Sequence, residues 1–72
     1  MSFSLGIDTG GTYTDAVIFD DISGSVKAKA KALTTRHELS IGIANAADKV
    51  LDFAGIKAAD IAMVSISTTL AT

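Results

Sequence analysis

The sequence contains no cysteine, no proline and no tryptophan among its 72 residues. Without cysteine, neither a disulfide framework nor a thiolate metal site can form. Basic residues are also few, because six lysines and arginines stand against eight acidic residues and give a net charge of −2. The chain therefore offers no basic surface of the kind that binds nucleic acid.

Targeting and membrane signals are also missing. Residues Met1 to Ser4 lack the basic start and the apolar core of a signal peptide. No apolar run approaches the roughly 20 residues that a membrane-spanning helix needs. We therefore expect a cytoplasmic protein that has no membrane partner. Its length allows at most one small domain, with a marginal core, because so short a chain buries only roughly 60% of its unfolded surface.

The most informative stretch is a polar, glycine-containing loop between two alternating apolar runs. The first run, about Phe3–Asp8, and the second, about Thr12–Asp20, have the period of two that predicts β-strands. The loop, Thr9–Thr12, contains two adjacent glycines, which permit positive φ and leave backbone amides uncovered. Amides that turn inward in such a loop form a concavity that binds phosphate.

Asp8 ends the first strand at the mouth of this loop. A carboxylate there repels bare phosphate, so it is useful mainly together with a cation. Mg²⁺ usually keeps several waters and takes one or two protein carboxylates plus phosphate oxygens. These residues fit a Mg²⁺ ion beside Asp8 and a phosphate on the Gly10–Gly11 loop, with the hydroxyls of Thr12 and Thr14 near the same spot. A plain hairpin turn fits the same residues, and spacing alone favours neither interpretation.

The middle of the chain predicts a third strand followed by a helix. Ser25–Leu33 alternates small apolar residues with three lysines, which suits a solvated edge strand. Thr35 and Glu38 have the spacing of a capping box, so we expect Thr35 to be the N-cap, and Glu38 the N3 residue, of a helix that runs to about Ala54. Gly55 is typical of the residue that closes a helix.

The last part of the chain predicts a fourth strand. The apolar run Ile61–Ile66 indicates a buried parallel strand, which Ser67, Thr68 and Thr69 end. These hydroxyls can line a nucleotide or substrate cleft, or they can belong to a strand end followed by a helix cap. The whole order is β-β-β-α-β, an α/β fold whose mixed sheet has the third and fourth strands at its edges and the helix on one face.

Two stretches of the chain resemble the hydantoinase/oxoprolinase family of the actin-like ATPase superfamily. The first is Leu5–Asp20, which contains an Asp-x-Gly-x-Thr hairpin, and the second is Val64–Thr72. In many family members the second stretch reads His-Gly-Thr-Thr-Val-Ala-Thr-Asn-Ala. Here Ile66 and Ser67 stand where that histidine and glycine would be, so no role of the histidine carries over.

The resemblance implies a ribonuclease H-like fold and an ATP-dependent hydrolase of cyclic amides. Residues 1–72 would then be a partial domain, the N-terminal part of a larger enzyme, without catalytic residues of its own. Asp8 would hold Mg²⁺, the loop Gly10–Thr12 would bind the β- and γ-phosphates of ATP, and Asp15 would hold the loop or the cation. A sugar or acid kinase of the same superfamily is an alternative, and so is a structural fragment without activity. Because the final strand is apolar and uncharged, we also expect the chain to form a homodimer.

Overall fold

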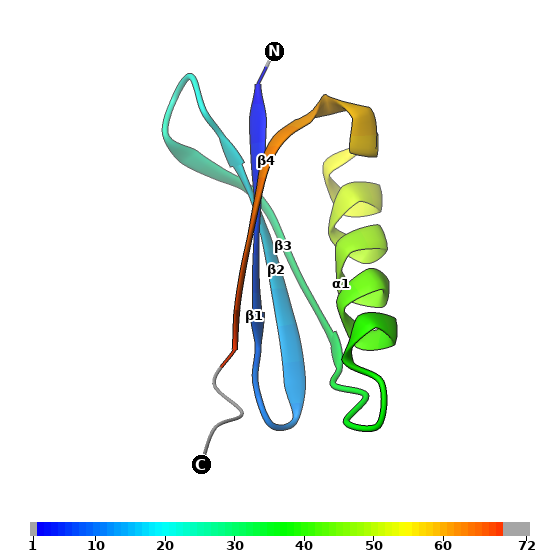
Figure 1. Cartoon of the computed structure of the whole chain (residues 1–72). Helices are drawn as coiled ribbons and strands as arrows, with labels where there is room; N and C mark the ends of the chain where they lie inside the picture. Colours follow the sequence, from blue (N-terminus) through cyan, green and yellow to red (C-terminus); the bar gives the residue numbers. More distant parts are fainter. Residues whose placement is uncertain (1, 69–72) are drawn as a thin grey trace.

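The computed structural model describes residues 2–68, which form a four-stranded sheet with one long helix against one of its faces (Figure 1). A short 3-10 turn, Ala58–Asp60, connects this helix to the last strand. The predicted order β-β-β-α-β is confirmed. The elements are β1 (Phe3–Thr9), β2 (Tyr13–Asp20), β3 (Ser25–Leu33), α1 (Leu39–Ala54) and β4 (Ile61–Thr68).

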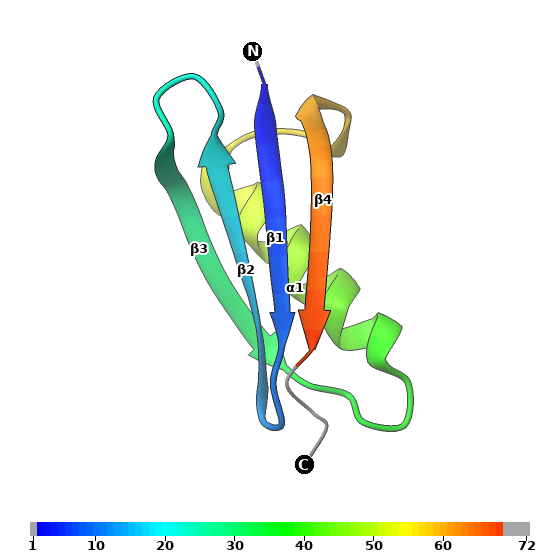
Figure 2. The same ribbon diagram turned by 60° about the vertical axis from the view of Figure 1, so that its left-hand side comes forward.

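The strands lie in the order β3-β2-β1-β4, so β3 and β4 form the two edges as the sequence predicted (Figure 2). β1 and β2 pair antiparallel, as do β2 and β3, whereas β4 runs parallel to β1. The return through α1 brings the chain back to the end of the sheet where β1 begins, which is what a parallel pair requires. The carboxyl ends of β1 and β4 therefore meet at one end of the sheet, beside the loop that joins β1 to β2.

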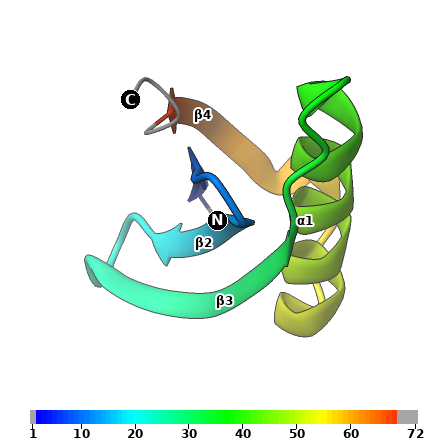
Figure 3. The same cartoon turned by 90° about the horizontal axis from the view of Figure 1, so that it is seen from below.

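One face of the sheet packs against α1 and forms the core (Figure 3). Every second residue of β1 and β2 points toward the helix, whose own buried positions are Gly42, Ala46 and Val50. The buried hydrophobic side chains are Phe3, Leu5, Ile7, Ala16, Ile18, Ala46 and Val50. In the part of the chain that the structure describes, no helix is both long and apolar enough to cross a membrane.

The expected burial of β4 is not found within residues 2–68. Met63, Val64 and Ile66 are 62%, 54% and 59% exposed. The physical reason is the position of α1, which packs on β1, β2 and β3 and leaves β4 at the margin. The apolar run of β4 therefore lies on the surface of the described chain.

The alternation along β3 is interrupted by a β-bulge, which the regular lysine pattern did not predict. Ile18 pairs with Ala28, but Phe19 pairs with Val26, so Lys27 has no partner on β2. Val26 consequently shares the face of Phe19, and the Nζ of Lys27 lies 5.6 Å from the centre of the Phe3 ring. Lys29 and Lys31 stay on the face opposite the helix.

The helix begins at Leu39 after an N-cap at Glu38, which lies three residues later than the predicted N-cap, Thr35. Glu38 occupies the N-cap position without a side-chain capping bond, so the Thr35–Glu38 capping box is wrong. The Thr35 hydroxyl instead donates to the Glu38 carbonyl at 2.6 Å and accepts the N–H of Gly42 at 2.8 Å. It therefore still bonds the first turn of the helix, through the Gly42 amide. The prediction that Gly55 ends the helix is confirmed, because Gly55 is the C-cap residue and has a left-handed φ of 69°.

Candidate functional site

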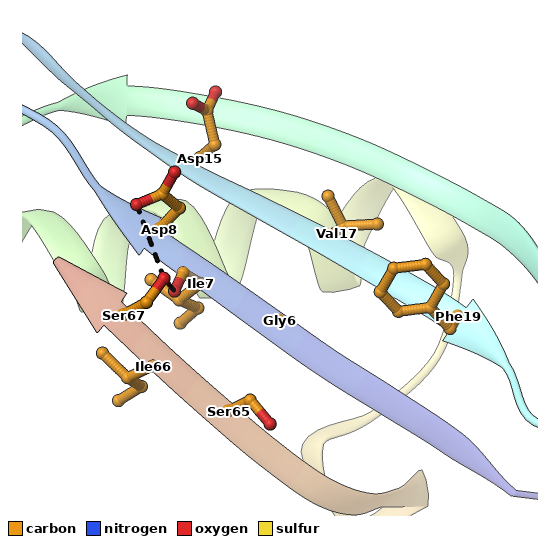
Figure 4. Close-up of a pocket in the computed structure, with 9 residues that line it drawn as sticks. All are labelled: Gly6, Ile7, Asp8, Asp15, Val17, Phe19, Ser65, Ile66 and Ser67. Atoms are coloured by element: carbon orange, nitrogen blue, oxygen red, sulfur yellow. Dashed lines mark hydrogen bonds between the residues drawn. The ribbon is translucent and has the colours of Figure 1, made fainter. Parts of the chain in front are cut away.

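The sheet face opposite α1 carries a groove of about 290 Å³ near the carboxyl ends of β1 and β4 (Figure 4). Asp8 and Asp15 are direct neighbours across the β1–β2 pair, and Ser67 lies opposite Asp8 across the β1–β4 pair. The Ser67 Oγ is 3.5 Å from Asp8 Oδ1. The groove is lined by Gly6, Ile7, Asp8, Asp15, Val17, Phe19, Ser65, Ile66 and Ser67.

The two predicted cation ligands thus lie side by side. Both Asp8 and Asp15 are exposed, and Figure 4 shows their carboxylates on the same face of the sheet. No cluster of three or more histidine, cysteine, aspartate or glutamate side chains occurs within residues 2–68. Mg²⁺ nevertheless needs only one or two protein carboxylates when water and phosphate complete its coordination. The pair Asp8 and Asp15, with the Ser67 hydroxyl, therefore fits such an ion in its donor set.

Asp15, Asp8 and Ser67 form a polar row across the sheet, and a lysine extends this row toward the β3 edge. Lys31 pairs with Asp15 across β2 and β3, so Lys31, Asp15, Asp8 and Ser67 follow one another across the sheet. The Nζ of Lys31 lies 5.1 Å from the centre of the Tyr13 ring, which places the ammonium over an aromatic face. The row contains one positive and two negative side chains, and Asp15 stands between Lys31 and Asp8.

The glycines of the hairpin loop do not use positive φ, contrary to the expectation from Gly-Gly. Among the described residues, the glycines with left-handed φ are Gly24 and Gly55. The N–H of Gly10 donates to the Tyr13 carbonyl at 3.0 Å and closes the hairpin. The amide of Gly10 is therefore not available to a ligand, which corrects one of the predicted phosphate contacts.

The carbonyl oxygens of Gly10, Gly11 and Thr12 accept hydrogen bonds from the segment that follows β3. The Thr34 hydroxyl donates to the Gly10 carbonyl at 2.8 Å, and the Thr34 N–H donates to the Thr12 carbonyl at 2.9 Å. The Arg36 Nε and Nη2 donate to the Gly11 carbonyl at 3.3 and 3.2 Å. Within the described chain, no hydrogen bond uses the N–H of Gly11 or Thr12. These two amides are the groups that remain for an anion.

Thr14 lies in the interior and not in the groove. Its side chain is fully buried, and its hydroxyl is 3.0 Å from that of Thr34. Because the single hydroxyl proton of Thr34 goes to the Gly10 carbonyl, Thr14 is the donor of this bond. Thr14 therefore supports the loop from behind, whereas the sequence placed it among the phosphate-binding residues.

Ser67 and Thr68, two of the hydroxyl residues predicted at the end of β4, lie on opposite faces of the sheet. Thr68 lies opposite the buried Thr9, on the other face from the groove, and Thr69 lies outside the described residues. Ser67 lines the groove. The register of β4 on β1 decides that Ser67 lies on the groove face of the sheet, and the sequence does not specify this register. Thr34 and Arg36 were also missed, because no local pattern shows which loops meet.

A family model described as "Hydantoinase/oxoprolinase N-terminal region" matches residues 4–72. The chain belongs to this family. It is also similar to the acetophenone carboxylase gamma subunit of Aromatoleum aromaticum, with 39% identity over 94% of this chain and 9% of that one. This hydantoinase/oxoprolinase chain thus spans about a tenth of the length of that curated relative.

Two solved structures are similar to this family member. Component A of the (R)-2-hydroxyglutaryl-CoA dehydratase of Acidaminococcus fermentans has a TM-score of 0.80 and 28% identity, over 94% of this chain and 25% of that one. A diol dehydratase-reactivating factor in nucleotide-free form has a TM-score of 0.81 and 30% identity, over 92% and 12%. The predicted fold class is confirmed, because both neighbours have the actin-like ATPase fold.

Proposed function

We propose that this chain forms the phosphate-binding part of an ATP-dependent enzyme of the hydantoinase/oxoprolinase type, whose substrate is a cyclic amide. The observation that carries the proposal is the orientation of the β1–β2 loop. The Gly10, Gly11 and Thr12 carbonyl oxygens accept hydrogen bonds from the segment after β3, and within residues 2–68 the N–H groups of Gly11 and Thr12 donate no hydrogen bond. Two adjacent free amides are a recognised anion-binding arrangement.

The neighbouring carboxylates support the nucleotide part of this proposal. Like charges directly opposite each other in a sheet are destabilising. A cation bound beside Asp8 and Asp15 would reduce this repulsion and would also attract a phosphate. In the proposal, Asp8 holds Mg²⁺ through water, while Asp15 holds a second water of the ion. The Ser67 hydroxyl, near Asp8 Oδ1, orients the Asp8 carboxylate.

When bound, ATP would supply a transferable γ-phosphoryl group; its transfer to the oxygen of an inert amide would release ADP and open the amide carbon to attack by water. The residues of this chain would contribute positioning and charge neutralisation, which are most of what phosphoryl transfer asks of a protein. Gly11 and Thr12 would bind phosphate oxygens through their amides, and Asp8 would fix the accompanying cation. The carboxylase relative favours a second candidate, a carboxylase subunit that uses the same phosphate site.

The test of this proposal is a titration of the ¹⁵N-labelled chain with Mg·ATP, followed by amide NMR. We expect weak, millimolar binding, because this chain supplies one wall of the proposed cleft, with the largest shifts at Gly11 and Thr12. Asp8→Asn should remove the dependence of binding on Mg²⁺. Asp48→Asn, an exposed change on α1, is the matched control and should bind as the wild type does. Unmoved Gly11 and Thr12 amides at millimolar Mg·ATP would contradict the proposed phosphate site.

A further inference from the structure

The residues Thr34–Arg36, which we call the clamp segment, connect the hairpin loop to the helix. Thr34 and Arg36 donate hydrogen bonds to carbonyl oxygens of the loop. Thr35, between them, bonds the helix: its hydroxyl accepts the Gly42 N–H and donates to the Glu38 carbonyl. Alternate residues of one short segment therefore hold two parts of the molecule that are far apart in the sequence.

The clamp segment decides where the loop amides point. In a trans peptide unit, the C=O of one residue and the N–H of the next point in opposite directions, and no cis peptide occurs in the described chain. The Gly10 carbonyl is held by Thr34, so the Gly11 N–H points away from the clamp segment. The Gly11 carbonyl is held by Arg36, so the Thr12 N–H also points away. Two successive amides are thus directed to the same side of the loop.

The position of the Thr34 side chain is itself fixed from the core. Thr14 is fully buried, and its hydroxyl donates to the Thr34 hydroxyl at 3.0 Å. The Thr34 hydroxyl in turn donates a hydrogen bond to the Gly10 carbonyl. A hydrogen-bonded chain therefore runs from the interior of β2 to the tip of the hairpin.

We infer that Thr34 and Arg36 are positioning residues, which hold the Gly11 and Thr12 amides in the direction that an anion requires. This inference rests on the proposed function, because it says how the same phosphate site is kept ready. The Arg36 guanidinium lies on the carbonyl side of the loop, so its role is to hold Gly11 and not to bind the anion beside the free amides.

Adjacent glycines make such a clamp necessary. Glycine has more conformational freedom than any other residue, and Gly10 and Gly11 stand next to each other in the loop. When only a fraction of the molecules have the binding conformation, the apparent affinity falls by that fraction. Loss of the Thr34 hydroxyl should therefore weaken anion binding although no ligand contact is removed.

The test compares two neighbouring threonines with the same chemistry and different partners. Thr34→Val removes the hydroxyl that holds the loop, Thr34→Ser retains it, and Thr35→Val removes the hydroxyl that holds the helix. Each full chain is titrated with inorganic pyrophosphate and Mg²⁺ by amide NMR. ¹⁵N relaxation of Gly11 and Thr12 is measured without ligand, and unfolding temperatures are recorded in parallel.

We expect Thr34→Val to bind pyrophosphate about tenfold more weakly, because several loop conformers replace one. Its Gly11 and Thr12 amides should also have lower order parameters. Thr34→Ser should restore both properties. Thr35→Val should lower the unfolding temperature but keep the binding and loop order of the wild type. Wild-type affinity and loop order in Thr34→Val, or equal losses in Thr35→Val, would overturn the inference.

The relaxation measurement separates this inference from the proposed function. If the wild-type chain binds no pyrophosphate, the phosphate site is wrong, and the clamp is then judged on loop order alone. Greater mobility of Gly11 and Thr12 in Thr34→Val than in Thr35→Val would support the clamp in that case. Equal mobility in the two variants would overturn it.

Discussion

Asp8 and Asp15 face each other across the β1–β2 pair, on the side of the sheet that α1 does not cover. Their surroundings differ, although both side chains are exposed. Asp15 has Lys31 as its other neighbour, on β3, whereas Asp8 has the neutral Ser67, on β4. The repulsion between the two carboxylates is therefore partly offset at Asp15 and not at Asp8.

This asymmetry predicts that Asp8→Asn stabilises the ligand-free chain. Removing one of two like charges that lie directly opposite should raise the free energy of unfolding by about 0.2–1 kcal/mol. Asp15→Asn should change it less, because it also removes the attraction to Lys31. Urea unfolding at low ionic strength measures both effects, and added salt should reduce the Asp8→Asn gain.

Asp48→Asn is the control for this prediction, since Asp48 lies exposed on α1, away from the groove. It should leave the unfolding free energy nearly unchanged. A larger gain from Asp15→Asn than from Asp8→Asn would mean that Lys31 does not offset the repulsion.

A second prediction contrasts two glycines that the sequence makes look equally constrained. Gly55 has φ of 69°, so Gly55→Ala should cost about 1–2 kcal/mol of stability. Gly11 lacks left-handed φ, and among residues 2–68 a Cβ there would meet the Arg36 Nη2 alone, at 3.2 Å. Because that atom ends a flexible side chain, Gly11→Ala should change stability by at most about 0.5 kcal/mol. Chemical denaturation of both variants checks this, and equal losses would show that the hairpin glycine is strained.

A third prediction concerns the glycine inside α1. Alanine is normally better than glycine in a helix by about 1 kcal/mol, yet Gly42→Ala should destabilise this chain. A Cβ at Gly42 would lie 2.9 Å from the Leu33 carbonyl oxygen and 3.1 Å from the Thr35 backbone nitrogen. Backbone atoms cannot move aside cheaply, and overpacking typically costs about 1–3 kcal/mol.

Thermal unfolding measures this effect, because about 1 kcal/mol shifts the unfolding temperature of so small a domain by roughly 4–8 °C. Asn45→Ala, at an exposed position of the same helix, is the matched control and should be neutral or slightly stabilising. An unfolding temperature of Gly42→Ala at or above that of the wild type would contradict the close approach of α1 to Thr35.

The fold could be predicted from the sequence because each strand has its own local signal. The alternation of Ser25–Leu33 predicted the bounds of β3, and the apolar run of β4 predicted a parallel strand. The β-bulge at Lys27 could not be predicted, since the lysine spacing remains regular through it. The start of α1 was placed too early, because Thr35 caps the helix from outside, through Gly42, and not as its N-cap residue.

The candidate site could be predicted only where it depends on one hairpin. The neighbouring positions of Asp8 and Asp15 follow from the β1–β2 loop, whose length sets the register. Ser67 depends on the register of two strands that are distant in the sequence, and a shift of one residue exchanges it with Thr68. Thr34 and Arg36 reach the hairpin only through tertiary packing, for which their sequence neighbourhood carries no signal.

The last prediction concerns self-association, for which the two sheet edges differ. The β3 edge carries lysines, and the Lys49 Nζ donates to the Lys31 carbonyl at 3.1 Å, which occupies an acceptor of that strand. β4 has no charged residue, and its Ile66 is 59% exposed. An uncharged, apolar edge strand is a template for pairing with another chain, most simply by two-fold symmetry.

We therefore expect a homodimer through β4 in sedimentation experiments at high micromolar concentration. Ile66→Lys should give a monomer, whereas Val26→Lys, on β3, should remain a dimer. A monomeric wild-type chain, or a dimer that only Val26→Lys disrupts, would show that β4 is not the interface.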